Sequence, residues 1–117
     1  MDKQRLISVK GDPYIGYMRV MALNFNLTEL EVKVAAELLR EFEFYLLQSN
    51  KQLAWELTCS AKTNKKIKDK LELKDASYNN VKASLKKKNL LTNAGFREGV
   101  YLADIKFIFS NEVGSYN

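Results

Sequence analysis

The residues best placed to do chemistry in this chain are its lysines, which gather between Lys62 and Lys88. That stretch holds ten lysines against three acids, Asp69, Glu72 and Asp75, so it carries +7. Because the net charge of the whole chain is +5, the remaining residues carry −2. Positive charge concentrated beside a weakly acidic remainder is typical of a surface that binds a polyanion such as DNA.

Most catalytic and metal-binding chemistry lacks its usual residues here. The chain has no histidine and a single cysteine, Cys59, which removes Ser-His and Cys-His nucleophile pairs and the common zinc ligand sets. Its five glycines fit neither of the glycine-rich phosphate-binding loops. We therefore expect a protein that is not an enzyme, with no catalytic residues, no metal, no cofactor and no small-molecule substrate.

Length and composition predict one soluble domain. The 117 residues are 46% hydrophobic, which suits a single core able to fold alone. No stretch approaches the roughly eighteen apolar residues needed to cross a bilayer, and the N-terminus lacks the residue order of a secretion signal. We expect an intracellular protein that does not enter the membrane.

Hydrophobic periodicity predicts the first half of the core. Thr28 and Glu31 form a capping box before a helix whose apolar stripe continues to about Gln48. The next segment alternates like a half-buried strand, with one inward face made of Leu53, Trp55, Leu57 and Cys59.

The second half reads as two helices and a hairpin. Thr63 or Asn64 can cap a helix that runs through Leu71, and Asp75 can cap another that ends near Asn89. A hairpin loop at 93–99 and a strand at 100–109 follow, the strand having one face of Tyr101, Ala103, Ile105, Phe107 and Phe109. The predicted order is helix, strand, helix, turn, helix and hairpin.

The N-terminal segment is the hardest to interpret. "RLISV" favours a strand and "KGDP" a turn, and we expect a short helix from about Tyr17 with an inward stripe of Met18, Met21, Ala22 and Phe25. We divide the chain into an apolar N-terminal extension at 1–26, a domain at 27–110 and a tail at 111–117.

The segment "IKDKLELKDASYNNVKASLKKKNLL" resembles a winged helix-turn-helix motif without a gap. Such a motif has apolar residues in its supporting helix and turn, in its recognition helix and in its first wing strand. The matching residues here are Ile67, Leu71, Leu73, Tyr78, Val81, Leu85, Leu90 and Leu91. Two positions differ from the usual pattern, because Glu72 replaces a small turn residue and Lys74 replaces a serine cap. The resemblance implies an α+β, mainly α, winged helix-turn-helix fold.

The flanking sequence is similar to the winged-helix initiator proteins of small plasmids and phages. Their wing carries an RG-x-Y-x-x-N/D pattern, matched here by Arg97, Glu98, Gly99, Val100, Tyr101 and Asp104, with Glu98 interrupting it. The resemblance implies a sequence-specific double-stranded DNA-binding protein, a transcription regulator or replication initiator, borne by a phage or plasmid in a bacterial cytoplasm. The alternative is a winged-helix module for protein–protein assembly, because many such folds never touch DNA.

The helix-turn-helix reading also selects candidate DNA contacts. The outward positions of the third helix are Ser77, Asn79, Asn80, Lys82, Ala83, Ser84, Lys86 and Lys87. Asparagine pairs with adenine, small residues permit close approach, and lysines meet phosphates. At the start of the second helix the candidates are Thr63, Asn64 and Lys65, near free backbone N–H groups. The alternative for all of them is an ordinary solvated helix face.

Four further residues have two interpretations each. Arg97 is either a minor-groove contact at the tip of the hairpin or an ordinary loop arginine. The aromatic residues Trp55, Tyr78 and Phe107 could stack on bases, but their positions on apolar faces favour the core. Cys59 continues the inward face of the expected strand, so we expect it to be buried.

The apolar N-terminal extension predicts an assembly. Residues 5–25 either cover the first helix of their own chain or pair with a second chain. We expect a homodimer with its two-fold axis near this segment, leaving the lysine-rich helices free for DNA.

Overall fold

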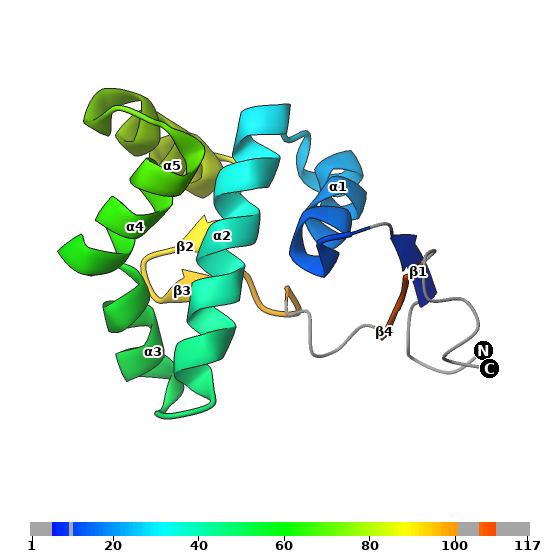
Figure 1. Cartoon of the computed structure of the whole chain (residues 1–117), viewed down its shortest axis with the longest axis horizontal. Helices are drawn as coiled ribbons and strands as arrows, with labels where there is room; N and C mark the ends of the chain where they lie inside the picture. The colour runs from blue at the N-terminus through cyan, green and yellow to red at the C-terminus, as the bar shows by residue number, and fades with distance from the viewer. Residues whose placement is uncertain (1–5, 10, 101–105, 110–117) are drawn as a thin grey trace.

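The computed structural model of the chain describes residues 6–9, 11–100 and 106–109. Within these residues the fold is α+β and mainly α, with five helices and two small two-stranded sheets (Figure 1). In chain order the elements are β1 (Leu6–Val9), α1 (Pro13–Phe25), α2 (Glu29–Leu46), α3 (Lys51–Thr58), α4 (Ala61–Leu71), α5 (Asp75–Lys87), β2 (Leu91–Thr92), β3 (Gly95–Phe96) and β4 (Lys106–Phe109). The expected tail at 111–117 lies outside the described residues.

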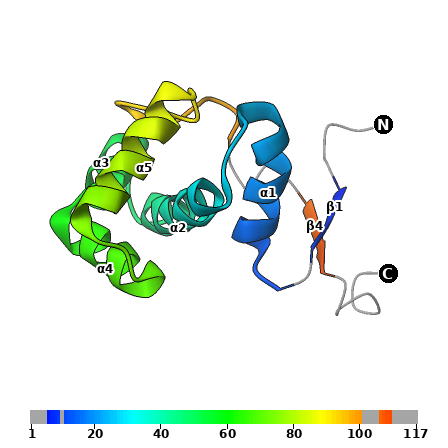
Figure 2. The ribbon, with the colours of Figure 1, turned by 90° about the horizontal axis from the view of Figure 1, so that it is seen from above.

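Helix α2 is the element on which the other helices pack. The predicted capping box is confirmed, since the Thr28 hydroxyl accepts from the Glu31 N–H and the Glu31 carboxylate accepts from the Thr28 N–H. The apolar stripe is fully buried at Val34, Leu38, Leu39 and Phe42. Figure 2 shows α2 between α1 on one side and α3, α4 and α5 on the other.

Helix α1 begins earlier than the sequence suggested. It starts at Pro13 rather than near Tyr17, because the Asp12 carboxylate caps its first turn and proline is tolerated there. Asp12 also pairs with Arg40 of α2. The expected strand is confirmed as β1, and Met18 and Met21 are buried as predicted. Helix α1 therefore covers α2 of its own chain.

The strand predicted at Leu53 to Cys59 was wrong, because this segment is the helix α3. Asn50 caps it by accepting a hydrogen bond from the Leu53 N–H at 2.8 Å. Its buried residues are Ala54, Trp55 and Thr58, which recur with helical spacing. Three of the four residues expected to face inward are exposed: Leu53, Leu57 and Cys59.

Helices α4 and α5 are joined by a tight turn. The Ser60 side chain, rather than Thr63 or Asn64, caps α4. The helix ends in a Schellman arrangement in which the Leu73 N–H donates to the Lys68 carbonyl at 2.9 Å. Glu72 adopts φ of +56° there, a conformation in which glycine is the usual residue.

The hairpin is shorter than predicted. Strands β2 and β3 are antiparallel, with Thr92 opposite Gly95, so the loop contains only residues 93 and 94 instead of 93–99. Gly95 permits this early return, because its φ is +142°, a conformation that residues with a side chain rarely adopt. The end of the expected 100–109 strand is β4, which pairs in parallel with β1. Residues 101–105, and with them most of its predicted face, lie outside the described residues.

An aromatic cluster joins α2, α3 and the hairpin. The Trp55 ring meets Phe42 and Phe96 edge-on, with centroid distances of 5.6 and 5.7 Å. Tyr78, 1% exposed, packs into the same core from α5. The prediction that Trp55 and Tyr78 are core residues is confirmed, whereas the side chain of Phe107 lies outside the described residues.

Candidate nucleic-acid interface

Helix α5 has one face in the core and one in solvent. Tyr78, Val81 and Leu85 are buried, as predicted from their spacing. Asp75 is the first helical residue rather than the cap, and position 74 makes no side-chain capping bond. Asp75 is also the only acid of α5, and its carboxylate pairs with Lys68 at 2.6 Å.

Six of the candidate DNA contacts on α5 are exposed together. They are Ser77, Asn79, Asn80, Ala83, Lys86 and Lys87. Ser84 does not belong to this surface, because it is partly buried and its hydroxyl donates to the Glu31 carboxylate of α2. In Figure 1 the α4–α5 pair lies at the opposite end of the molecule from β1 and β4.

We call the lysine-rich stretch from Lys62 to Lys88 the basic segment. The fold pairs some of its lysines with nearly buried carboxylates and leaves others without such a partner. Three α2 glutamates, each 5% exposed, pair with lysines of the basic segment. We call this the lysine–glutamate seam, and its pairs are Glu41–Lys66 at 2.7 Å, Glu37–Lys70 at 2.9 Å and Glu31–Lys88 at 2.6 Å. The seam holds α4 and the end of α5 against α2, and its lysines are not free to neutralise phosphates.

Sequence reasoning missed the seam, although a signal was present. Glu37 and Glu41 are four residues apart on α2, and Lys66 and Lys70 have the same spacing on α4. Opposite charges with matching helical spacing can pair across two packed helices.

The lysines of the basic segment that lie outside the seam form what we call the accessible positive surface. Lys65 pairs with Asp69 of its own helix at 2.9 Å, an exposed contact of little energetic weight. Among the described carboxylates, none pairs with the side chains of Lys62, Lys74, Lys82, Lys86 or Lys87.

A small polar cluster fixes the junction of α4 and α5. The Tyr78 hydroxyl donates to the Asn64 side-chain oxygen at 2.8 Å, and the Lys82 ammonium lies 3.4 Å from the same oxygen. The Asn64 amide nitrogen donates to the Cys59 carbonyl at 3.3 Å. The Lys82 ammonium also lies 5.2 Å from the centre of the Tyr78 ring. Partial burial lowers the pKa of Lys82, and the neighbouring ammonium groups of Lys86 and Lys68 act in the same direction.

Two candidates lie elsewhere than the sequence suggested. The Thr63 hydroxyl is buried and donates to the Leu57 carbonyl at 2.9 Å, so its side chain is not available as a phosphate contact. It is buried because α4 begins three or four residues earlier than predicted, with Ser60 as its cap, which turns position 63 inward. Arg97 follows β3 instead of standing at the hairpin tip, and its guanidinium lies 5.9 Å from the centre of the Phe25 ring of α1.

Cys59 is exposed instead of buried, because it ends a helix and does not continue a strand face. Burial of part of its side chain raises the pKa of the thiol, while the nearby Lys82 and Lys86 ammonium groups lower it. Cys59 therefore lies beside the accessible positive surface.

Within the described residues no three cysteine, aspartate or glutamate side chains gather as metal ligands. None of the described helices is long and apolar enough to span a membrane. No family model, curated protein or solved structure matches the chain.

Proposed function

We propose that this protein binds double-stranded DNA through the exposed face of α5. In this proposal α4 and α5 form a helix-turn-helix, β2 and β3 form a short wing, and the protein acts as a transcription regulator or replication initiator borne by a phage or plasmid. The observation that carries the proposal is the composition of the α5 face: asparagines, small residues and lysines without carboxylate partners among the described residues.

Each kind of residue on this face has a role in the proposal. Asn79 and Asn80 can pair with base edges in the major groove, where an amide fits adenine. Ser77 and Ala83 are small enough to let the helix backbone approach the bases. Lys86 and Lys87, near the C-terminal end of α5, reach phosphates and supply affinity that depends on salt.

The first test changes the phosphate contacts. Replacing Lys86 and Lys87 together by glutamine should weaken binding to any duplex, because two phosphates lose their partner. The slope of log affinity against log salt concentration should fall by about one unit for each lost contact. Fluorescence anisotropy with labelled duplexes over a salt series measures both effects.

The control for this test is Lys33→Gln, the same kind of substitution at one exposed position of α2. It should leave the salt slope unchanged. If the double variant stays folded and binds as the unaltered protein does, α5 does not contact the DNA backbone.

The second test removes the side chains that are proposed to contact base edges. Asn79→Ala or Asn80→Ala should reduce discrimination between a preferred and an unrelated duplex by about 1–3 kcal/mol, the worth of one bidentate base contact. Preferred duplexes come from capture and sequencing of genomic fragments. Equal losses on every duplex would instead make these residues phosphate contacts.

We also propose a homodimer, so that two α5 helices read two half-sites. Because α1 packs on its own chain, the partner surface would be its outer side, where Leu23 is 86% exposed. Light scattering at micromolar concentration should give twice the mass of one chain, and Leu23→Glu should reduce it to one. A monomeric unaltered protein would contradict the dimer and leave the α5 proposal intact.

A further inference from the structure

Lys82 is held in place by the fold, unlike the exposed lysines further along α5. Its side chain is partly buried, and its ammonium group lies 3.4 Å from the Asn64 side-chain oxygen and 5.2 Å from the centre of the Tyr78 ring. Lys82 is three residues after Asn79 and four before Lys86, so these side chains share one edge of the α5 face. This ordered lysine therefore lies where the exposed face of α5 meets α4.

The Asn64 side chain ties three helices together beside Lys82. Asn64 belongs to α4, and its amide oxygen accepts from the Tyr78 hydroxyl of α5 at 2.8 Å. Its amide nitrogen donates to the carbonyl of Cys59, which ends α3, at 3.3 Å. Tyr78 is only 1% exposed, so its ring and hydroxyl are fixed by the core. Both ends of the Asn64 amide are thus bound within the fold, and the oxygen that Lys82 meets has a set position.

Ammonium groups gather at this junction without matching carboxylates. Lys68, 6.0 Å from the centre of the Tyr78 ring, has a carboxylate partner in Asp75. None of the described carboxylates pairs with Lys82 or Lys86. Burial lowers the pKa of the Lys82 ammonium group, and the ammonium groups of Lys86 and Lys68 lower it further. Because a partly buried charge without a counter-charge costs stability, an anion bound here would stabilise the folded protein.

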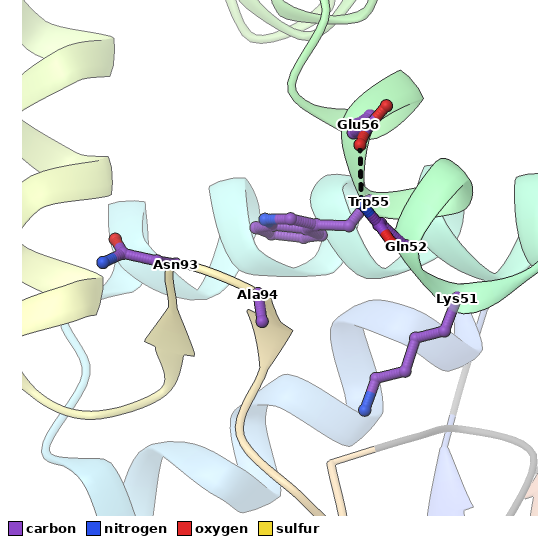
Figure 3. A pocket seen from close by; sticks show the side chains of 6 residues that line it. All are labelled: Lys51, Gln52, Trp55, Glu56, Asn93 and Ala94. Atoms are coloured by element: carbon purple, nitrogen blue, oxygen red, sulfur yellow. Dashed lines mark hydrogen bonds between the residues drawn. The ribbon is translucent and has the colours of Figure 1, made fainter.

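The cleft between α3 and the turn of the β2–β3 hairpin offers no comparable charge (Figure 3). Its lining includes one lysine, Lys51, and one glutamate, Glu56, whose carboxylate accepts from the Gln52 amide at 3.3 Å. These two charges balance, whereas a DNA backbone is attracted to a net positive surface. The junction of α4 and α5 is therefore the better site for a phosphate.

We propose that Lys82 binds one particular phosphate of the DNA backbone at the junction of α4 and α5, with Asn64 and Tyr78 as its positioning residues. This inference rests on the DNA-binding function proposed above. An ammonium group has three N–H donors, so those not directed at Asn64 remain for phosphate oxygens. Because the Lys82 side chain is already ordered, it loses less conformational entropy on binding than a free lysine does. The bound phosphate fixes the register of α5 on the duplex.

The test compares Lys82→Met with Lys86→Met, the same substitution one helical turn further on. Methionine removes the charge and keeps most of the apolar stem. Lys82→Met should weaken binding to any duplex roughly tenfold or more, the worth of a hydrogen bond from a charged group. Lys86→Met should weaken it about threefold or less, because an exposed, freely rotating charge contributes little. Fluorescence anisotropy with labelled duplexes measures both affinities.

Stability separates a phosphate contact from a structural role. Lys82→Met should leave the urea midpoint unchanged or raise it, because the ammonium group has no carboxylate partner among the described residues. A lowered midpoint, or a loss of affinity no larger than that of Lys86→Met, would overturn the inference and leave the α5 proposal intact. An unaltered protein that binds no duplex would overturn both.

A double-mutant cycle tests the positioning role of Asn64. Asn64→Ala should weaken duplex binding roughly fivefold, as expected for one neutral hydrogen bond. The same substitution should have no further effect once Lys82 is methionine, and its full effect when Lys86 is methionine instead. Tyr78→Phe, which removes only the hydroxyl, replaces Asn64→Ala in the cycle if that variant does not fold. Equal effects in the two backgrounds would show that Asn64 does not act through Lys82.

Discussion

Replacing Phe42 by alanine should lower the free energy of unfolding by about 3–5 kcal/mol, the usual result of deleting a buried aromatic side chain. Phe42 is fully buried and is the α2 member of the aromatic cluster. Its ring centre lies 5.6 Å from that of Trp55 and 6.1 Å from that of Phe96. Removing it leaves a cavity where α2, α3 and the hairpin meet, so all three lose packing together. Urea unfolding followed by circular dichroism measures the change.

The matched control lies two residues further along the same helix. Phe44 is 56% exposed, and its ring contacts Tyr45 at a centroid distance of 5.5 Å. Phe44→Ala should change the free energy of unfolding by less than about 1 kcal/mol, because little buried surface is lost. Equal effects of the two substitutions would show that the cluster is not the core of this fold.

Glu31→Ala is expected to lower the free energy of unfolding by about 2–3 kcal/mol at neutral pH. This carboxylate has two structural roles. It completes the capping box of α2 with the Thr28 N–H, and it accepts from Ser84 and Lys88 at the end of α5. Without it, Lys88 loses its carboxylate and α5 loses a tie to α2. Chemical denaturation measures the effect.

The control is Glu29→Ala in the same first turn of α2. Glu29 pairs with Arg19 at 2.8 Å, but both side chains are more than half exposed. Solvent screens such a pair, so this substitution should change the free energy of unfolding by less than about 1 kcal/mol.

Because of Glu31, the free energy of unfolding should also depend on pH in the acidic range. Burial alone would raise the pKa of its carboxyl, but the hydrogen bonds from Lys88, Ser84 and the Thr28 N–H hold the pKa below the ordinary value of 4.5. Between these two pKa values the unfolded chain binds the proton more readily than the folded one. The stabilisation is therefore fully present above pH 4.5 and is lost as the pH falls through the folded pKa.

Glu31→Gln removes this proton-binding group without changing the shape of the side chain. The difference in unfolding free energy between the unaltered protein and the variant should be largest above pH 4.5 and shrink below it. A difference that stays constant down to the acid transition would show that Glu31 is not the carboxylate responsible.

The sequence alone determined the elements that depend on neighbours along the chain. The start of α2 follows from Thr28 and Glu31, three residues apart, because a capping box is made within one helical turn. The inward face of α5 follows from the spacing of Tyr78, Val81 and Leu85. These features need no knowledge of the rest of the molecule.

The tertiary structure alone decided which of two possible faces of residues 51–58 is buried. Leu53, Trp55 and Leu57 alternate as in a strand, but Ala54, Trp55 and Thr58 form an equally consistent helical face. Packing beside α2 buries the second set, and a short segment follows its environment more than its intrinsic pattern. The pairing of β4 with β1 is equally non-local, since it joins the two ends of the chain.

The sequence determined the amount of positive charge in the basic segment, and the tertiary structure decided which lysines are paired and which are exposed. The sequence determined that ten lysines lie between residues 62 and 88, because charge is a property of each residue. Only the packing of α4 and α5 on α2 decided that Lys66, Lys70 and Lys88 meet nearly buried glutamates while Lys86 and Lys87 face solvent. An ion pair depends on the distance between two side chains, and for residues far apart in sequence the fold sets that distance.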